Sequence, residues 1–255
     1  MIPVDQCTVC TDHMSDVIAS GTELSVETLR SHRNCLRRTL FIISCSHRKQ
    51  IGGEQPLWRD AILRGRTSAF PELNPLRMQI AETATQKEGI QYFHMALGEF
   101  RDIDAASAVN SEILVSPTLR AVERYRGQLY CNLGEEAINR LRSGKANNVL
   151  ILSALNGPTL PRDLVPNYDL MMRDSIQGEL LSSKWVSAIK HDGARLFEFV
   201  RGFGRCVAPV SREYKEVAKQ VADCASVPFY HLPFKNSGGT PRAGRLLRAV
   251  VSEIY

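Results

Sequence analysis

Leu40-Phe41-Ile42-Ile43-Ser44-Cys45 is the segment that most clearly indicates the fold class of this chain. A short, unbroken apolar run of this kind is typical of a strand that is buried on both faces of a sheet. The same signature returns at Asn148-Val149-Leu150-Ile151-Leu152-Ser153. Helix candidates lie between and after the two runs. The pattern therefore predicts an α/β fold with a mixed sheet core flanked by helices.

The other expected elements alternate between helices and short apolar runs. Helices are expected at 25–38, 58–64, 75–89, 116–126, 133–143, 178–190, 212–225 and 241–254. Strands are expected at 91–97 and 228–234, and a further apolar stretch lies at 205–210. The chain contains no internal repeat, low-complexity tract or P-loop, so its sequence gives no support for nucleoside triphosphate chemistry.

Composition is that of an ordinary globular protein. The 255 residues are 44% hydrophobic and 23% charged, which is enough for one large core or two small domains. The longest apolar runs are far shorter than the roughly 20 residues of a membrane-spanning helix, so no span is expected. The N-terminus has no basic region followed by an apolar core, which predicts a cytoplasmic protein. In that reducing compartment we expect the 7 cysteines to be thiols, metal ligands or nucleophiles rather than disulfides.

Basic residues slightly outnumber acidic ones. The net charge is +5, from 32 basic and 27 acidic residues, which favours anionic partners without requiring them. The basic residues gather in two clusters, which are Arg30, Arg33, Arg37, Arg38, Arg48 and Lys49, and then Lys235, Arg242, Arg245 and Arg248. Two interpretations stay open for each cluster, a solvated helix face and a phosphate-binding surface.

Residues 1–38 are predicted to form a small zinc-finger-like module, with residues 39–255 as the main α/β domain. The module carries two pairs of metal-ligand residues at the same spacing, namely Cys7, Cys10, His32 and Cys35. Two such pairs suit a closed tetrahedral zinc site, and four protein ligands would make the ion structural. His13 is an alternative to His32. The other interpretation is two unconnected pairs without a metal.

The polar loops beyond the two strands are candidate site walls, because ligands bind beyond the carboxyl ends of strands in open α/β sheets. The first loop reads Ser44-Cys45-Ser46-His47-Arg48-Lys49. One interpretation makes Cys45 a thiolate nucleophile that the neighbouring positive charges activate. The other, which we favour, is an anion-binding turn in which backbone amides and Arg48 or Lys49 hold a phosphate or carboxylate.

Five motifs follow in the remainder of the chain. They are Tyr125-Arg126-Gly127-Gln128-Leu129-Tyr130, Leu152-Ser153-Ala154-Leu155-Asn156-Gly157, Pro161-Arg162-Asp163-Leu164-Val165-Pro166-Asn167-Tyr168-Asp169-Leu170-Met171-Met172, Val210-Ser211-Arg212-Glu213-Tyr214 and Arg242-Ala243-Gly244-Arg245. In this order they resemble the YaaA peroxide-stress protein family. That family has Tyr-x-Gly-x-x-Tyr, Leu-Ser-Gly/Ala-x-x-Gly, Pro-x-Asp-x-Ile-x-Pro-Tyr-x-x-x-Met, Ala-Ser-x-Glu-Tyr and a Lys/Arg-Ala-Arg-Gly region. The resemblance covers about residues 40 to 255.

The chain departs from the family pattern near both loops. The family's early Ser-Pro-Ala-Lys corresponds here to residues 44–49, which are closer to the Cys-Ser-x-x-Lys form of a neighbouring branch. Asn156 stands where the family usually has an aromatic residue, and Pro158 follows the glycine directly. These departures suggest a pocket for a different substrate. The resemblance implies a YaaA-like α/β fold and a link to DNA binding, protection from oxidative damage and modified-base metabolism.

These motifs contain the residue types that commonly hold a nucleobase. The tyrosines would offer stacking surfaces, while Ser153 and Asn156-Gly157 would offer hydrogen bonds and close backbone approach. Asp163, Asp169 and Glu213 are candidate acids, bases or ribose ligands. The alternative is that the tyrosines belong to the core and the carboxylates cap helices or pair with arginines. The candidate binding residues are Ser44, Ser46, Lys49, Tyr125, Tyr130, Ser153, Asn156, Gly157, Tyr168, Arg242 and Arg245, and the candidate catalytic residues are Asp163, Glu213 and Cys45.

Two functions are expected from these features. The first is an enzyme that acts on a nucleoside, nucleotide or nucleic-acid base, with N-glycosidic bond hydrolysis as the favoured reaction. Asp163 or Glu213 would activate water or stabilise an oxocarbenium-like centre, and no redox cofactor would be needed. A variant of this function uses Cys45 as a covalent nucleophile in group transfer. The second function is a non-catalytic DNA-binding protein of the stress response, whose N-terminal module and basic C-terminal helix track the DNA backbone.

Overall fold

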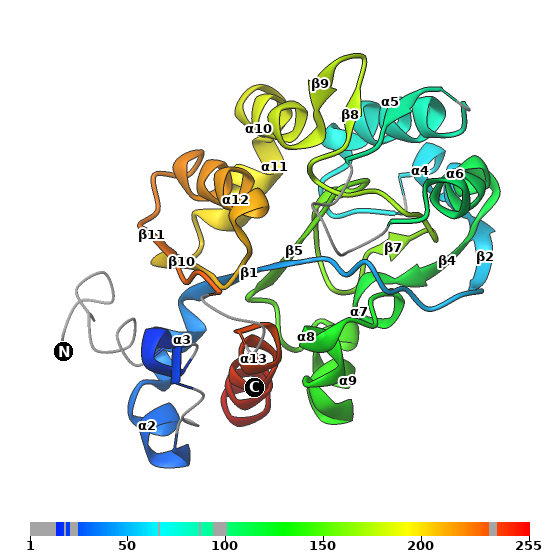
Figure 1. Cartoon of the computed structure of the whole chain (residues 1–255). Helices are drawn as coiled ribbons and strands as arrows, with labels where there is room; N and C mark the ends of the chain where they lie inside the picture. The colour runs from blue at the N-terminus through cyan, green and yellow to red at the C-terminus, as the bar shows by residue number, and fades with distance from the viewer. Residues whose placement is uncertain are drawn as a thin grey trace.

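A computed structural model of the chain describes residues 14–17, 19–20, 25–65, 67–86, 88–93, 101–234 and 239–255. These residues form a five-stranded sheet flanked by helices, with two three-stranded antiparallel sheets beside it (Figure 1). The predicted α/β class with a mixed sheet is thus confirmed. Across the same residues, no helix combines the length and hydrophobicity that crossing a bilayer requires.

The main sheet has a parallel centre and one antiparallel edge strand. Its strands, in spatial order, are β11 (Phe229–His231), β10 (Arg205–Ala208), β1 (Thr39–Ser44), β5 (Val149–Ser153) and β6 (Gly157–Thr159). The first four are parallel, and β6 runs antiparallel to β5. Phe41 of β1 lies opposite both Val149 of β5 and Val207 of β10. The carboxyl ends of β1, β5 and β10 consequently lie along one edge of the sheet.

The two apolar runs become the central strands because both faces of the sheet are covered. Residues 40–43 of β1 are at most 1% exposed, and every residue of β5 is fully buried. Burying one large aliphatic or aromatic side chain in this way contributes about 1.5–3 kcal/mol relative to leaving it exposed. Both apolar runs end in a serine, Ser44 and Ser153, so the first polar side chains lie at the carboxyl edge of the sheet.

Helices cover both faces of the main sheet (Figure 1). On one face lie α10 (Leu181–Asp192), α11 (Ala194–Val200) and α12 (Arg212–Asp223). On the other face lie α2 (Val26–Ser31), α3 (Arg33–Arg37), α8 (Gln128–Cys131), α9 (Gly134–Ser143) and α13 (Gly239–Ile254). The expected helices at 133–143, 212–225 and 241–254 are confirmed as α9, α12 and α13.

The two small sheets and their helices extend the fold beyond the carboxyl ends of β1 and β5 (Figure 1). One sheet contains β2 (Glu54–Leu57), β4 (Pro117–Arg120) and β7 (Leu164–Val165), and the other contains β3 (Ile90–Gln91), β8 (Ser175–Ile176) and β9 (Glu179–Leu180). The helices α4 (Trp58–Leu63), α5 (Asn74–Ala84), α6 (Ile103–Ser111) and α7 (Ala121–Arg124) pack around them, as do 3-10 turns at Pro71–Leu73 and Ile113–Val115. The two small sheets and their helices therefore surround the polar residues at the carboxyl ends of β1 and β5.

Several expected elements have other bounds in the structure, and two of them differ in type or over most of their length. The helix expected at 116–126 is strand β4 followed by the single turn of α7, because Leu119 pairs with Val165 and Thr118 donates to the backbone of β2. Tertiary pairing therefore overrides the local helical pattern. The strand expected at 91–97 is limited to β3, which ends at Gln91, and residues 94–97 lie outside the described part of the chain.

The described part of the N-terminal module shares the core of the main domain. Met14, Leu29 and Leu36 belong to the same buried cluster as the strands. Arg33 and Arg37 both donate to Ile254 O, at 3.3 and 3.1 Å, and so satisfy a carbonyl at the C-terminus of α13. Two members of the first basic cluster thus have a structural role at the end of a helix.

Candidate functional site

Polar side chains from five segments meet at the carboxyl edge of β1 and β5. Cys45 follows β1 directly, and its Sγ lies 3.3 Å from the hydroxyl of Tyr214 in the first turn of α12. We call the group around this contact the edge cluster, which comprises Cys45, Lys49, Tyr125, Ser153, Tyr168 and Tyr214. The sheet topology explains the meeting, because β1, β5 and β10 all end here and α12 starts just after β10.

A chain of hydroxyl groups runs through the edge cluster. The Tyr125 hydroxyl lies 3.0 Å from that of Tyr168, which lies 2.8 Å from Ser153 Oγ. Ser153 Oγ also accepts a hydrogen bond from Asn156 N at 2.8 Å. Burial raises the pKa of both tyrosines, so their hydroxyls stay protonated and serve as neutral donors and acceptors.

The loop after β1 is fixed by pairing with the segment around Tyr125. Lys49 and Tyr125 form an antiparallel bridge, and Arg126 N donates to Arg48 O at 2.9 Å. We call this pair of extended segments the ribbon. Glycine is needed at position 127 beside it, because a Cβ atom there would lie 2.3 Å from Ser46 Oγ. The guanidinium of Arg124 stabilises the ribbon by donating hydrogen bonds to four backbone carbonyls, those of Gln50, Gly52, Pro117 and Val165. The loop is therefore held at many points.

Lys49 has a special position in the edge cluster. Its Nζ lies 4.0 Å from the centroid of the Tyr168 ring, in cation–π geometry. Burial lowers the pKa of Lys49 to about 8, although the neighbouring Cys45 and Asp169 favour the charged form. The amine therefore titrates near neutral pH.

Next to the cluster, an ion network surrounds Asp169. Arg101 donates to Asp169 Oδ1 at 3.0 Å and to the fully buried Asp174 at 2.7 Å. His47 Nδ1 lies 3.4 Å from the same oxygen of Asp169. Burial raises the pKa of Asp169, but the hydrogen bond from His47 and the charge of Arg101 outweigh it, so the pKa lies below its ordinary value. Because 21% of its side chain is exposed, Asp169 presents an ionised carboxylate to solvent.

The predicted catalytic carboxylates lie in different surroundings. Asp163 accepts hydrogen bonds from Leu160 N at 2.9 Å and Ala69 N at 3.2 Å, and it is 7% exposed. It thus braces two loops, and burial raises its pKa to about 6. Glu213 pairs with Arg173 at 3.1 Å at the start of α12, and 28% of its side chain is exposed. Of the three carboxylates named from sequence, Asp169 is the one whose charge acts on Lys49 of the edge cluster.

Several predicted binding residues do surround the edge cluster. Lys49, Tyr125, Ser153 and Tyr168 belong to it, and the remaining neighbours are Ser44, Ser46, Tyr130 and Asn156. Tyr130 donates to Ser44 O at 2.8 Å.

Three further predicted residues have other surroundings. Gly157 has φ +60° and packs on the ring of Trp185, where a Cβ would lie 2.3 Å away, so its role is in the turn between β5 and β6. Arg242 donates to Ala19 O at 2.6 Å, and Arg245 lies half-buried one turn further along α13.

The expected stacking role of the tyrosines requires a correction. Tyr125, Tyr130 and Tyr168 are only 1%, 3% and 1% exposed, so their ring faces pack in the interior. They contribute hydroxyl groups to the edge rather than platforms for a base. Two half-buried rings, Tyr92 and Phe93, lie closer to solvent, with Arg101 and Arg173 each 4.9 Å from one ring centroid. Each of these two rings thus packs against a guanidinium group of the chain.

Sequence reasoning missed Arg101 and Asn110. Asn110 lies on α6 and binds the backbone of Asp169, and Arg101 lies just before that helix. Neither residue belongs to a motif or to a basic cluster, and only the folded chain brings them to Asp169. Tyr214 lies in the motif at residues 210–214, but its contact with Cys45 depends on the placement of α12.

The zinc site remains a prediction. Cys7, Cys10 and the alternative ligand His13 lie outside the described residues. Cys35 is buried on α3, where its Sγ accepts a hydrogen bond from Arg205. Within the described ranges, no group of three or more His, Cys, Asp or Glu side chains is arranged to hold a metal ion.

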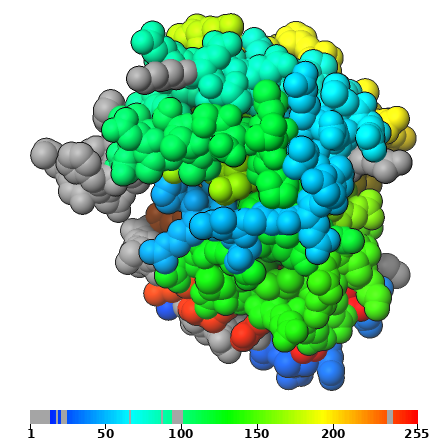
Figure 2. Space-filling model, turned by 90° about the vertical axis from the view of Figure 1, so that its right-hand side faces the viewer, coloured from blue at the N-terminus to red at the C-terminus, as the bar shows by residue number. Residues whose placement is uncertain are grey.

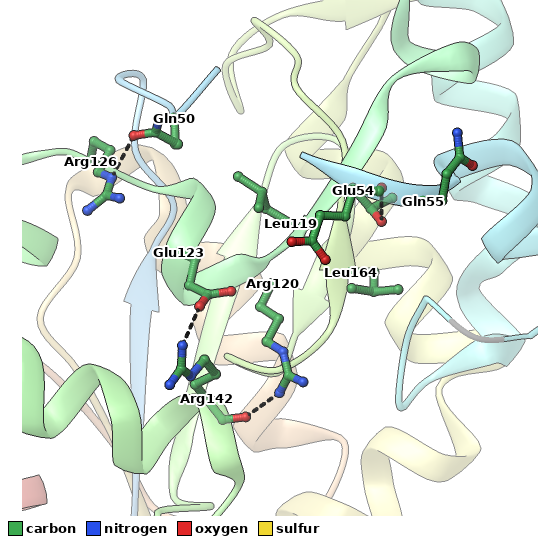
Figure 3. Close-up of a pocket in the computed structure, with 10 residues that line it drawn as sticks. Gln50, Glu54, Gln55, Leu119, Arg120, Glu123, Arg126, Arg142 and Leu164 are labelled. Atoms are coloured by element: carbon green, nitrogen blue, oxygen red, sulfur yellow. Dashed lines mark hydrogen bonds and ion pairs between the residues drawn. The ribbon is translucent and has the colours of Figure 1, made fainter. Parts of the chain in front are cut away.

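An open basin adjoins the ribbon that carries Lys49 (Figure 3). It has a volume of about 620 Å³ and is lined by Gln50, Glu54, Gln55, Thr118, Leu119, Arg120, Glu123, Arg126, Arg142 and Leu164. Arg126 donates to Gln50 at 3.2 Å, and Arg142 pairs with Glu123 at 3.1 Å (Figure 3). Because side chains alternate along paired extended segments, Lys49 and Tyr125 face the edge cluster while Gln50 and Arg126 line the basin.

The surface is hollowed on the same side of the molecule. Figure 2 shows a depression between the blue segment that follows β1 and the green segment around α6. Yellow-green atoms from the chain beyond β6 form its floor (Figure 2). Solvent thus reaches into the region between these segments.

Comparison of the chain with protein-family models and with curated proteins finds no match. The likeness to the YaaA family therefore rests on the sequence motifs alone.

Proposed function

We propose that this protein is an enzyme that acts on a nucleotide base at the N-glycosidic bond, with its active site at the edge cluster and Asp169. The observation that carries the proposal is the placement of the Asp169 carboxylate near the Lys49 amine at the carboxyl edge of the sheet. Asp169 is ionised, while Lys49 titrates near neutral pH. Such a pair of groups with separated pKa values is typical of acid–base sites.

Cleavage of an N-glycosidic bond develops positive charge at the anomeric carbon and the ring oxygen of the sugar. A carboxylate that stays ionised can stabilise that charge or orient the attacking water. Asp169 fits this role, because Arg101 and His47 keep it charged and part of it faces solvent. His47, whose side chain is 58% exposed, is placed to move a proton beside it.

The surroundings also favour an anionic substrate. Arg48 is exposed in the loop after β1, and Arg120, Arg126 and Arg142 line the basin across the ribbon. A nucleotide at the edge cluster would therefore have guanidinium groups nearby for phosphates on either side. We infer that the substrate is a base within a polynucleotide strand rather than a free nucleoside.

The resemblance to the YaaA family supports the same class of substrate. Its link to DNA and to modified-base metabolism agrees with a site built for a nucleotide, and we propose a YaaA-like fold on this basis. We also propose a structural zinc in the N-terminal module, which would contribute to folding and not to the reaction. The proposed hydrolysis uses water and protein side chains, so it requires no redox cofactor.

The test is base release from a panel of nucleosides, nucleoside monophosphates and oligonucleotides, read by mass spectrometry after metal analysis of the purified protein. We expect release from an oligonucleotide, with a loss of at least about 100-fold in Asp169→Asn. Asp163→Asn is the matched control, because that carboxylate braces loops away from Lys49; its turnover should stay near the wild-type value in the folded fraction.

The competing function is a non-catalytic DNA-binding protein, which the basin of arginines would also suit. Tight, salt-sensitive oligonucleotide binding without base release from any substrate would contradict the enzyme and favour that function. Loss of turnover in folded Asp163→Asn but not in Asp169→Asn would move the catalytic role to Asp163.

A further inference from the structure

The amine of Lys49 is held differently from an ordinary surface lysine. It is half-buried, lies 4.0 Å from the centroid of the Tyr168 ring, and makes a long hydrogen bond of 3.4 Å to His47 O. The lysine ion pairs in the described part of the chain involve Lys184, Lys215 and Lys219, and none includes Lys49. No salt bridge therefore fixes this amine in the protonated form.

Burial makes the amine of Lys49 easier to deprotonate than that of an ordinary lysine. Burial lowers the pKa of Lys49 to about 8, and the charges of Arg101 and Arg124 act in the same direction. Cys45 and Asp169 oppose this lowering without cancelling it. At pH 7 a larger fraction of this amine is therefore neutral than of a lysine with the ordinary pKa. A neutral amine is the nucleophilic form of lysine.

We propose that Lys49 forms an imine with the aldehyde carbon of a sugar that has lost its base. The inference rests on the proposed function, because cleavage of a deoxynucleotide glycosidic bond produces such a sugar. The Nζ lone pair attacks the C1′ carbonyl carbon, and the oxygen takes up a proton to give a carbinolamine. The C1′–O bond then breaks, water leaves, and the nitrogen loses its second proton as the C=N bond forms. Amine and aldehyde thus give imine and one water, with no change of oxidation state.

The neighbours of Lys49 suit this condensation. His47 lies two residues away in the same loop, and its ring contacts Asp169, whose charge acts on Lys49. The buried Tyr168 ring lies against Nζ, and Lys49 is half-buried, so part of its side chain faces solvent. Tight pairing of the loop with Tyr125 and Arg126 holds Lys49 in place.

The test is reductive trapping with the full chain, 2-deoxyribose 5-phosphate and sodium cyanoborohydride, followed by peptide mass spectrometry. We expect the adduct on Lys49, and at least about 10-fold less labelling in Lys49→Arg, since a guanidinium keeps the cation over Tyr168 but forms no imine. Adducts of the Cys45 thiol are not fixed by this reduction. Lys145→Arg, which alters an exposed lysine after α9, is the matched control and should label like the wild type.

The outcomes separate this inference from the proposed function. Labelling spread over exposed lysines, or unchanged in Lys49→Arg, would overturn the inference. If Lys49→Arg does not fold, the ratio of adduct on Lys49 to adduct on Lys145 in the wild type decides in its place. Base release without an adduct on Lys49 would contradict the imine, while the proposed function would still stand. An adduct on Lys49 without base release from any substrate would contradict the proposed function and would show only that Lys49 reacts with aldehydes.

The pH dependence of trapping gives a second readout. The groups that act on Lys49 are Cys45, Asp169, Arg101 and Arg124, and the Tyr168 ring lies against its amine. Labelling of Lys49 should level off as the pH rises through about 8. Labelling of Lys49 that is still rising steeply well above that pH would contradict the proposal.

Discussion

Asn110 holds the backbone of Asp169 through both of its side-chain polar groups. Its Nδ2 donates to Asp169 O at 2.7 Å, and its Oδ1 accepts from Asp169 N at 2.7 Å. Asn110 is completely buried on α6, so the helix fixes the position of the carboxylate from behind. The geometry of the proposed site therefore depends on a residue that lies outside it.

Asn110→Ala should weaken both the fold and the site. The change leaves Asp169 N without its acceptor, while Asp169 O keeps a second donor, Arg101 Nη2, at 2.7 Å. An unsatisfied backbone group of this kind costs about 1–3 kcal/mol. We expect a lower free energy of unfolding in urea and a lower turnover number. Asn139→Ala, on the exposed side of α9, is the control and should change neither quantity. An Asn110→Ala variant with the stability of the wild type would show that the hydrogen bonds between Asn110 and Asp169 are not needed for the fold.

Arg101→Met should be among the most destabilising changes in this region. Asp174 is completely buried and pairs with Arg101 at 2.7 Å, so the variant leaves a buried carboxylate without its cation. Breaking such a pair costs about 3–5 kcal/mol. Arg201→Met removes a pair with Glu198 whose side chains are 58% and 60% exposed, and it should have little effect. Similar unfolding free energies for the two variants would contradict the assigned role of Arg101.

Asp163 should make stability depend on pH in an unusual direction for a carboxylate. Its folded-state pKa is raised to about 6 from the ordinary 3.8, so the folded chain binds this proton more tightly than the unfolded chain. The contribution is therefore fully present below about pH 3.8 and is lost as the pH rises through about 6, by about 3 kcal/mol. Urea unfolding of the wild type and Asp163→Asn between pH 4 and 7.5 should show this difference. Identical pH profiles would show that Asp163 does not titrate in this way.

The centre of the fold was predictable because its signal is local. Runs of apolar residues at 40–43 and 149–152 require cover on both faces, and the structure provides it. The loops after these strands could also be placed at one edge, since parallel strands end together. Helix 116–126 was predicted wrongly because its pattern is local while the pairing of Leu119 with Val165 is not.

The site was only partly predictable for the same physical reason. Cys45, Lys49, Ser153 and Tyr168 could be named because they follow strands or lie in recognisable motifs. Spacing along the sequence does not reveal how deeply a side chain is buried. The tyrosines that were expected to offer stacking surfaces therefore turned out to be interior residues that contribute their hydroxyl groups. Arg101 reaches Asp169 across 68 residues of sequence, and no periodicity or spacing encodes that contact.

The basin arginines should carry the salt dependence of oligonucleotide binding. Arg126 and Arg142 line the basin, and each phosphate contact that a cation makes releases counterions from the nucleic acid. For a fluorescent single-stranded oligonucleotide, Arg126→Ala and Arg142→Ala should each weaken binding and reduce the slope of log K against log salt by about 0.7. Glu123→Gln should strengthen binding, because the carboxylate that pairs with Arg142 at 3.1 Å competes with phosphate for that guanidinium. Arg201→Ala, in an exposed pair with Glu198, is the matched control and should leave the slope unchanged. If the basin variants and the control bind alike across the salt range, the polynucleotide strand does not cross the basin, and a free nucleotide becomes the better substrate for the edge cluster.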